Sequence, residues 1–147
     1  MSRIPSTIIS RRLAVAYAIV VIALSSFPGL DLPDVGRGGL DKVLHFAQYG
    51  VLGFLVSRGW GPWRADGATG LMSWLPALIL LGFAGADEYH QHWIPGRYPE
   101  WLDWTADITG VLIGYIVGGW RNHRTRSRMV RANRIQGNPS GSSYQSR

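Results

Sequence analysis

The sequence predicts an all-α membrane protein, a bundle of four transmembrane helices with both termini in the cytoplasm. First, the apolar residues gather into four blocks, and each block approaches the length of about 20 residues that spans a bilayer core as helix. The blocks cover residues 13–30, 43–60, 71–89 and 106–120. Second, the blocks lack the polar outer face with a period of 3.6 residues that a soluble four-helix bundle shows. Third, the arginines flank alternate loops.

The first block, residues 13–30, follows Arg11 and Arg12 and contains the run LAVAYAIVVIAL. Two arginines before an apolar run also begin a secretory signal peptide. This run is long, however, and the SSFPG that ends it matches a small-x-small cleavage site poorly. We therefore interpret the block as an anchor that is not cleaved.

The second and third blocks carry polar residues at one end. Asp41, His45 and Gln48 are spaced by four and three, which places them on one face of a helix. The third block ends in the run DEYHQHWIPGR, from Asp87 to Arg97. Charged groups at the end of a lipid-facing segment are costly, so this run indicates a functional site.

The fourth block, residues 106–120, carries a row of glycines in register with two aspartates. Asp103 and Asp107 are four residues apart, and the same face continues through Gly110, Gly114 and Gly118. Glycines at intervals of four allow neighbouring helices to approach closely. We therefore expect the glycine face to be buried and both aspartates to point into the bundle.

The orientation follows from the distribution of cations, because cytoplasmic loops of membrane proteins are enriched in lysine and arginine. Arginines precede the first block, flank the loop at residues 61–68 and fill the segment after Trp120. This places both termini in the cytoplasm. All acids but Asp66 fall on the outer side: Asp31, Asp34, Asp41, Asp87, Glu88, Glu100, Asp103 and Asp107.

We divide the chain into a transmembrane domain, residues 1–120, and a basic tail, residues 121–147. The tail lacks apolar periodicity, so we predict a disordered cytoplasmic segment that contacts anionic lipid headgroups at about 1 kcal/mol per cation. It carries most of the net charge of +6, which therefore does not indicate nucleic-acid binding. The absence of cysteine excludes disulfides and thiolate chemistry.

A turn at Pro95 and Gly96 presents Arg97 next to the acidic helix ends. The planar guanidinium suits a carboxylate or a phosphate. Two interpretations stay open, an internal salt bridge to Glu88 or Asp103 and a clamp for a ligand. The aromatic residues around this loop are typical of an interfacial belt; they are Trp93, Tyr98, Trp101 and Trp104.

Three segments, DKVLHFAQYGVLGFL (41–55), DEYHQHWIPGR (87–97) and LDWTADITGVLIG (102–114), resemble the VanZ-like membrane proteins. That family is named after a determinant of resistance to the glycopeptide teicoplanin. Its pattern combines Asp-Lys-x-x-His, Asp-Glu-x-x-Gln, Pro-Gly-Arg and Asp-x-x-x-Asn-x-x-Gly. Asp107 departs from the pattern by standing where the family commonly has asparagine. The resemblance places the motif on Asp41, Lys42, His45, Asp87, Glu88, Gln91, Arg97, Asp103 and Gly110.

The resemblance implies a protein of the bacterial cytoplasmic membrane that alters the cell envelope. Its expected action is to lower sensitivity to lipid-anchored glycopeptides such as teicoplanin, or to bind or modify an outer-leaflet lipid or a lipid-linked glycan. Membrane lipids and such a glycan or glycopeptide are the expected partners, and an oligomer stays open. The predicted binding residues are Asp41, Lys42, His45, Asp87, Glu88, Gln91, Arg97, Asp103 and Asp107.

Two other classes of function stay open. In an intramembrane hydrolase or transferase, Glu88 or Asp103 would act as general base, while His45 or Arg97 steadies developing charge. Ser25 and Ser26 are the hydroxyl candidates.

A metal site is a variant of the enzyme alternative, with His45, Asp87, Glu88, His90, His92, Asp103 and Asp107 as candidate ligands. Buried acids beside a histidine are also typical of a proton-coupled transporter. The sequence identifies neither the ligand nor a cofactor.

Overall fold

The computed structural model describes residues 6–28, 39–61, 71–97 and 100–136. This part of the chain forms four α-helices and one 3₁₀-helix, so the predicted all-α class is confirmed. The elements are α1 (Ser6–Ser25), α2 (Leu40–Trp60), η3 (Leu71–Ser73), α3 (Leu75–Gln91) and α4 (Trp101–Gln136).

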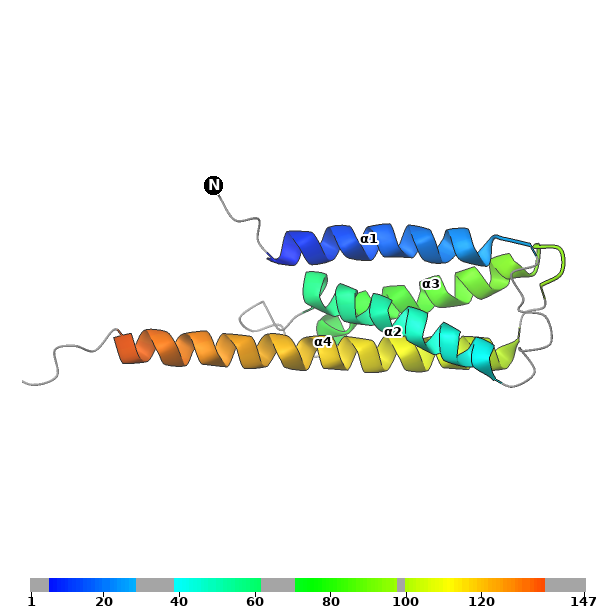
Figure 1. Ribbon diagram of the computed structural model, residues 1–147. Coiled ribbons are helices and arrows are strands. Elements are labelled where there is room, and N and C mark those ends of the chain that lie inside the picture. The colour runs from blue at the N-terminus through cyan, green and yellow to red at the C-terminus, as the bar shows by residue number, and fades with distance from the viewer. Residues whose placement is uncertain (1–5, 29–38, 62–70, 98–99, 137–147) are drawn as a thin grey trace, which may run out of the picture.

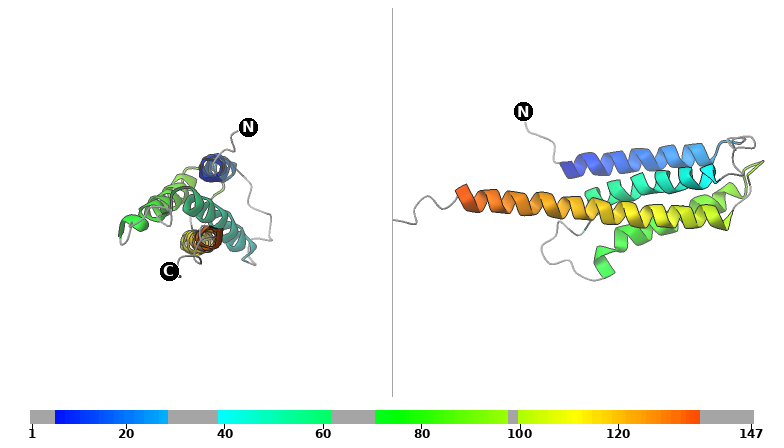
Figure 2. Two further views of the ribbon diagram at one scale, coloured as in Figure 1. Left: turned by 90° about the vertical axis from the view of Figure 1, so that its left-hand side faces the viewer. Right: turned by 60° about the horizontal axis from the view of Figure 1, so that its bottom comes forward.

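The helices alternate in direction along the chain (Figure 1). The end of α1, the start of α2, the end of α3 and the start of α4 therefore lie together, and we call this the site end. In the end-on view, α1 and α4 lie on opposite sides of α2 (Figure 2). α2 contacts each of the other three helices, and its contact with α4 is the most extensive in the bundle.

The helices begin and end at other residues than the apolar blocks of the sequence. α1 begins at Ser6, well before the block at residue 13, and ends at Ser25, shortly before Pro28. Proline lacks an N–H and cannot continue a helix, so it limits α1. α3 begins at Leu75 with Pro76 in its first turn, where the missing N–H costs nothing.

The structure differs from the predicted disorder over residues 121–136, because α4 continues through this segment to Gln136. Arginine, methionine, alanine and glutamine are good helix formers, and residues after Trp120 only extend a helix that is already nucleated. At 36 residues, α4 is about 54 Å long. The rest of the predicted tail, residues 137–147, lies outside the described residues.

The bundle buries apolar and polar side chains together and exposes many large apolar ones. Large apolar side chains are exposed on the outer faces, as at Ile19 (63% exposed), Ile79 (66%) and Ile116 (51%). The buried set contains eight polar or charged residues: Ser10, Ser25, Ser57, Asp87, Glu88, Gln91, Asp103 and Asp107. Within the described residues, α1 is the one helix long and apolar enough to cross a membrane. α3 has only 17 residues, and α2 and α4 are interrupted by charged groups.

The glycine row of α4 faces α2, which confirms the predicted buried face. A Cβ atom added at Gly110 would overlap the carbonyl oxygen of Phe46, and one added at Gly114 would overlap that of Gly50. At Gly118 the added atom would lie 2.8 Å from the Cβ of Ser57. These glycines therefore allow the two helix backbones to touch.

Candidate functional site

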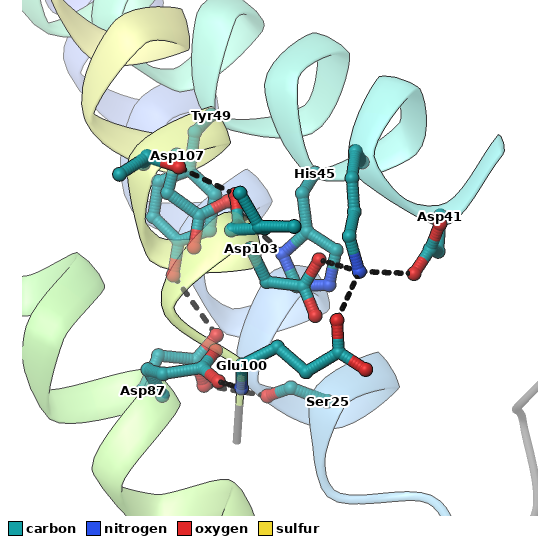
Figure 3. A network of polar contacts seen from close by, with 12 residues as sticks. Ser25, Asp41, His45, Tyr49, Asp87, Glu100, Asp103 and Asp107 are labelled. Atoms are coloured by element: carbon teal, nitrogen blue, oxygen red, sulfur yellow. Dashed lines mark hydrogen bonds and ion pairs between the residues drawn. The ribbon is translucent and has the colours of Figure 1, made fainter. Parts of the chain in front are cut away.

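Polar side chains from all four α-helices meet at the site end (Figure 3). All nine predicted binding residues lie there, joined by three that the prediction did not include. We call the whole set the polar cluster. It comprises Ser25, Asp41, Lys42, His45, Tyr49, Asp87, Glu88, Gln91, Arg97, Glu100, Asp103 and Asp107.

Asp87 joins three helices through its two carboxylate oxygens. Oδ1 accepts a hydrogen bond from Ser25 Oγ on α1 at 2.6 Å, and Oδ2 accepts one from the Tyr49 hydroxyl on α2 at 2.9 Å. A buried carboxylate is costly unless it is hydrogen-bonded, and Asp87 is only 6% exposed. The hydrogen bonds from the two hydroxyl groups therefore offset the cost of burying the Asp87 carboxylate. Tyr49 was missed from the sequence, although it follows His45 by four residues on one face of α2.

Of the two predicted hydroxyl candidates, only Ser25 belongs to the polar cluster. Its hydroxyl lies against the Asp87 carboxylate, and the oxygen is also 3.0 Å from the carbonyl oxygen of Ile22. Ser26 instead donates to the Ile22 carbonyl at 2.6 Å and has no described contact with the cluster. Ser26 is therefore removed from the set of candidates.

His45 and Asp107 form a polar contact that links α2 to α4. The distance from His45 Nδ1 to Asp107 Oδ1 is 3.0 Å, and Asp107 is 1% exposed. The glycine row explains this pairing, because Gly110 allows the backbones to approach less than one turn beyond Asp107. A carboxylate bound to one ring nitrogen fixes the orientation of an imidazole. Asp107, the residue that departs from the family pattern, therefore positions His45.

Lys42 lies among three carboxylates of the polar cluster. Its Nζ atom is 2.6 Å from Asp41 Oδ2, 2.6 Å from Glu100 Oε2 and 2.9 Å from Asp103 Oδ1. Asp41 and Lys42 precede the apolar block that begins at Val43. Burial opposes the charged forms, but hydrogen bonding outweighs it, lowering the pKa of Asp41 and raising the pKa of Lys42. Both groups therefore stay charged.

Glu88 connects the end of α3 to the start of α4. Its Oε1 atom accepts a hydrogen bond from the backbone N–H of Glu100 at 2.8 Å. Glu100 precedes α4, and its own carbonyl accepts bonds from the N–H groups of Asp103 and Trp104. A carboxylate is favourable at a helix N-terminus, where N–H groups lack intrahelical partners. The other oxygen of Glu88, Oε2, is buried and has no hydrogen-bond partner among the described residues.

Arg97 forms no ion pair among the described residues, so the predicted internal salt bridge to Glu88 or Asp103 is not observed. Its Nη1 atom donates to Gln91 Oε1 at 3.0 Å, and Nη2 donates to the carbonyl oxygen of Leu24 at 3.4 Å. Nε is buried without a described partner. Gly96 adopts φ +84°, a left-handed conformation that suits glycine, and so forms the predicted turn before Arg97.

Of the candidate metal ligands, only Asp103 belongs to a group of described acids close enough to share an ion. In the described part of the chain, the acids close enough to share an ion are Asp41, Glu100 and Asp103, whose oxygens lie within 4.8 Å of one another. The Lys42 ammonium lies among the same three carboxylates and supplies positive charge there. Only Asp103 of these three was in the predicted ligand set. The site end thus favours a network of hydrogen bonds and ion pairs over a compact metal centre.

Aromatic side chains border the site end. Tyr89 packs edge-to-face on Trp93 with ring centroids 4.7 Å apart, and Trp101 packs likewise on Trp104 at 5.8 Å. Tyr89, Trp93 and Trp101 are all more than 60% exposed. Exposed tryptophan and tyrosine in one layer are typical of a membrane interface. Tyr98, the remaining predicted member of this belt, lies outside the described residues.

The fold and the polar cluster together define a class: a helical bundle with an apolar exterior that encloses a charged network at one end. Residues 4–121 match the family model described as VanZ/LLP1. This match extends over most of the chain, which therefore belongs to the VanZ/LLP1 family and confirms the resemblance seen in its motifs. No curated protein and no solved structure shows a significant match to the chain.

Proposed function

We propose that this VanZ/LLP1 protein is an integral protein of the bacterial cytoplasmic membrane, with all four helices crossing the bilayer. The exposed apolar side chains on each helix support this placement, because lipid is the solvent that such an exterior suits. The charges support the orientation. Every described acid lies at the site end, and four of the described arginines lie at the opposite end. The polar cluster is then at the outer face, and both termini are cytoplasmic.

The topology can be tested with alkaline phosphatase fusions, which are active only outside the cytoplasm. Fusions at Pro33 and Gly96 are expected to be active and a fusion at Asp66 inactive, because Arg58 and Arg64 keep the loop that contains Asp66 inside. Activity at Asp66 together with inactivity at Gly96 would place the polar cluster in the cytoplasm. The proposed action on the outer leaflet would then be excluded.

We further propose that the polar cluster binds the headgroup of an outer-leaflet lipid or a lipid-linked glycan, and thereby lowers sensitivity to lipid-anchored glycopeptides such as teicoplanin. This proposal rests on two buried polar atoms that have no hydrogen-bond partner among the described residues. Arg97 Nε is a buried donor and Glu88 Oε2 a buried acceptor, and neither has a described partner. Buried polar groups are normally satisfied, so each favours a ligand that offers the complementary group. A headgroup with phosphate and hydroxyl groups offers both.

The functional test uses three nearly isosteric substitutions, Glu88→Gln, Arg97→Lys and Asp103→Asn. In a susceptible bacterial host that expresses the protein, each is expected to abolish the reduction in teicoplanin susceptibility. Glu88→Gln and Asp103→Asn each remove a negative charge. Arg97→Lys keeps the positive charge but removes the planar guanidinium. Tyr89→Phe, an exposed change beside Glu88, is the control and should keep the phenotype. Stable, inserted variants that all retain the full phenotype would reduce the cluster to a structural network.

An intramembrane enzyme is the second candidate, favoured by the contact of the Ser25 hydroxyl with the Asp87 carboxylate at 2.6 Å. A hydroxyl beside a carboxylate is an arrangement in which the carboxylate can accept the proton of a nucleophile. The two functions predict different results for Ser25→Ala. An enzyme that uses Ser25 loses its phenotype with this variant and keeps it with Tyr49→Phe, which removes the other bond to Asp87. A binding protein responds to the two variants alike.

A further inference from the structure

The end of the bundle opposite the polar cluster contains the start of α1, the end of α2 and the middle of α4 (Figure 1). Each of these three segments carries arginine. We call the set the arginine cluster; it comprises Arg11, Arg12, Arg58 and Arg121. The described side chains supply no carboxylate here, since every described acid lies at the site end.

Arg11 is held in place by the packing of α1 on α2. Its Nε atom donates to the carbonyl oxygen of Gly59 at 2.8 Å, and its Cζ atom lies 5.4 Å from the centroid of the Trp60 ring. A Cβ atom at Gly59 would lie 2.9 Å from Arg11 Cγ. The glycine therefore makes room for this side chain. Arg11 is thus an ordered part of the helix interface, although the residue is exposed to solvent.

Arg58 and Arg121 approach one aromatic ring from two different helices. Their Cζ atoms lie 5.7 Å and 6.0 Å from the centroid of Phe54. Each guanidinium is attracted to the π electrons of the ring by a cation–π interaction. Bringing two like charges to one ring costs electrostatic energy, which a neighbouring anion offsets. The geometry therefore favours an anionic occupant beside Arg58.

We propose that the arginine cluster is a binding site for the phosphate of an anionic phospholipid headgroup in the inner leaflet. Phosphate oxygens accept paired hydrogen bonds from the guanidinium fork. Trp60 and Trp120 at the same end are 41% and 56% exposed, and indole rings in such positions lie at headgroup level. The inference rests on the proposed placement in the membrane but is independent of the ligand at the polar cluster.

The test measures which lipids the full-length protein retains. Protein is reconstituted into nanodiscs of equal phosphatidylglycerol and phosphatidylcholine, and the retained lipids are counted by native mass spectrometry. Phosphatidylglycerol is expected to be enriched over phosphatidylcholine by about fivefold for each engaged arginine, which corresponds to about 1 kcal/mol per cation. The double variant Arg11→Gln/Arg58→Gln should return the retained lipids to nearly equal amounts.

A matched control separates a built site from general attraction to positive charge. Arg131→Gln/Arg134→Gln removes two charges from the distal part of α4 and should reduce the enrichment less than Arg11→Gln/Arg58→Gln does. Equal loss in both double variants, or no enrichment in the unchanged protein, would overturn the proposal. Displacement of phosphatidylglycerol by millimolar inorganic phosphate would show a free-phosphate site, and would also overturn it.

Two further measurements keep the result interpretable. Extraction of membranes with alkaline carbonate reports insertion separately, so a protein that fails to insert contradicts the membrane placement and not the lipid preference alone. Arg58→Lys keeps the charge and loses the fork, so it should lose part of the enrichment even if the double variant does not fold. Full enrichment in this variant would exclude recognition by the guanidinium edge of Arg58.

Discussion

Gly114→Leu is expected to separate α2 from α4 and to cause the largest loss of stability of any single change in the glycine row. A Cβ atom at Gly114 would overlap the carbonyl oxygen of Gly50 and lie 3.0 Å from the backbone N of Phe54. Backbone atoms cannot move aside as a flexible side chain can, so the helices must part. Overpacking of a core costs about 1–3 kcal/mol when side chains can adjust, and a backbone clash costs at least as much.

The measurement is the apparent melting temperature of the purified protein in detergent. A loss of about 3 kcal/mol corresponds to a decrease on the order of 10 °C for a chain of this size. Ile113→Leu is the matched control, because Ile113 precedes the glycine directly, is 48% exposed and has room for a side chain of the same volume. Equal melting temperatures for the two variants would show that α4 does not use this face in the bundle.

Asp87→Leu is expected to weaken the site end next most strongly, because it leaves the buried Tyr49 hydroxyl without its acceptor. Ser25 and Tyr49 both donate to this carboxylate, but the Ser25 hydroxyl also has the carbonyl oxygen of Ile22 at 3.0 Å as an acceptor. An unsatisfied buried donor costs about 1–3 kcal/mol, so the loss at Tyr49 should lower stability by about this amount. The variant should also lose the proposed reduction in teicoplanin susceptibility, since Asp87 no longer joins α1, α2 and α3 at the polar cluster.

Tyr49→Phe is the comparison for Asp87→Leu. It keeps the buried charge but removes the donor to Asp87 Oδ2, so it should also lower stability, by about 1–3 kcal/mol. Replacing a buried charge by an apolar side chain sometimes stabilises a protein, because the cost of desolvating the charge disappears. An unchanged or higher melting temperature for Asp87→Leu would therefore show that desolvation outweighs the hydrogen bonds to Asp87.

The sequence predicted the number of helices and the buried face of α4 because both leave periodic signals. Apolar blocks of near-spanning length mark the helices, and glycines at intervals of four mark the seam at Gly110 and Gly114. The continuation of α4 to Gln136 leaves no such signal. A helix without an apolar face depends on propensity alone, which is a weak indicator in a segment rich in arginine.

The composition of the polar cluster was predictable, and its pairings were not. Spacing along a helix places Asp41 and His45 on one face, and the family motif adds Arg97. Which partner each group finds depends on how far the helices slide and rotate against one another. For Arg97 the sequence left an internal salt bridge and a ligand clamp open, and in the structure Arg97 donates to Gln91. The hydroxyl of Tyr49 was overlooked for the same reason.

The close contact of α2 with α4 also constrains how the protein is made. A ribosome adds about 5–20 residues per second, so α2 emerges several seconds before the segment of α4 that faces it. During that interval His45 on α2 has no Asp107 to bind, and the groove around Gly50 is unfilled. A chain that stops before Trp101 leaves this surface of α2 uncovered. The polar cluster is therefore completed only when α4 has been made, and shorter chains present a polar face of α2 without its partners.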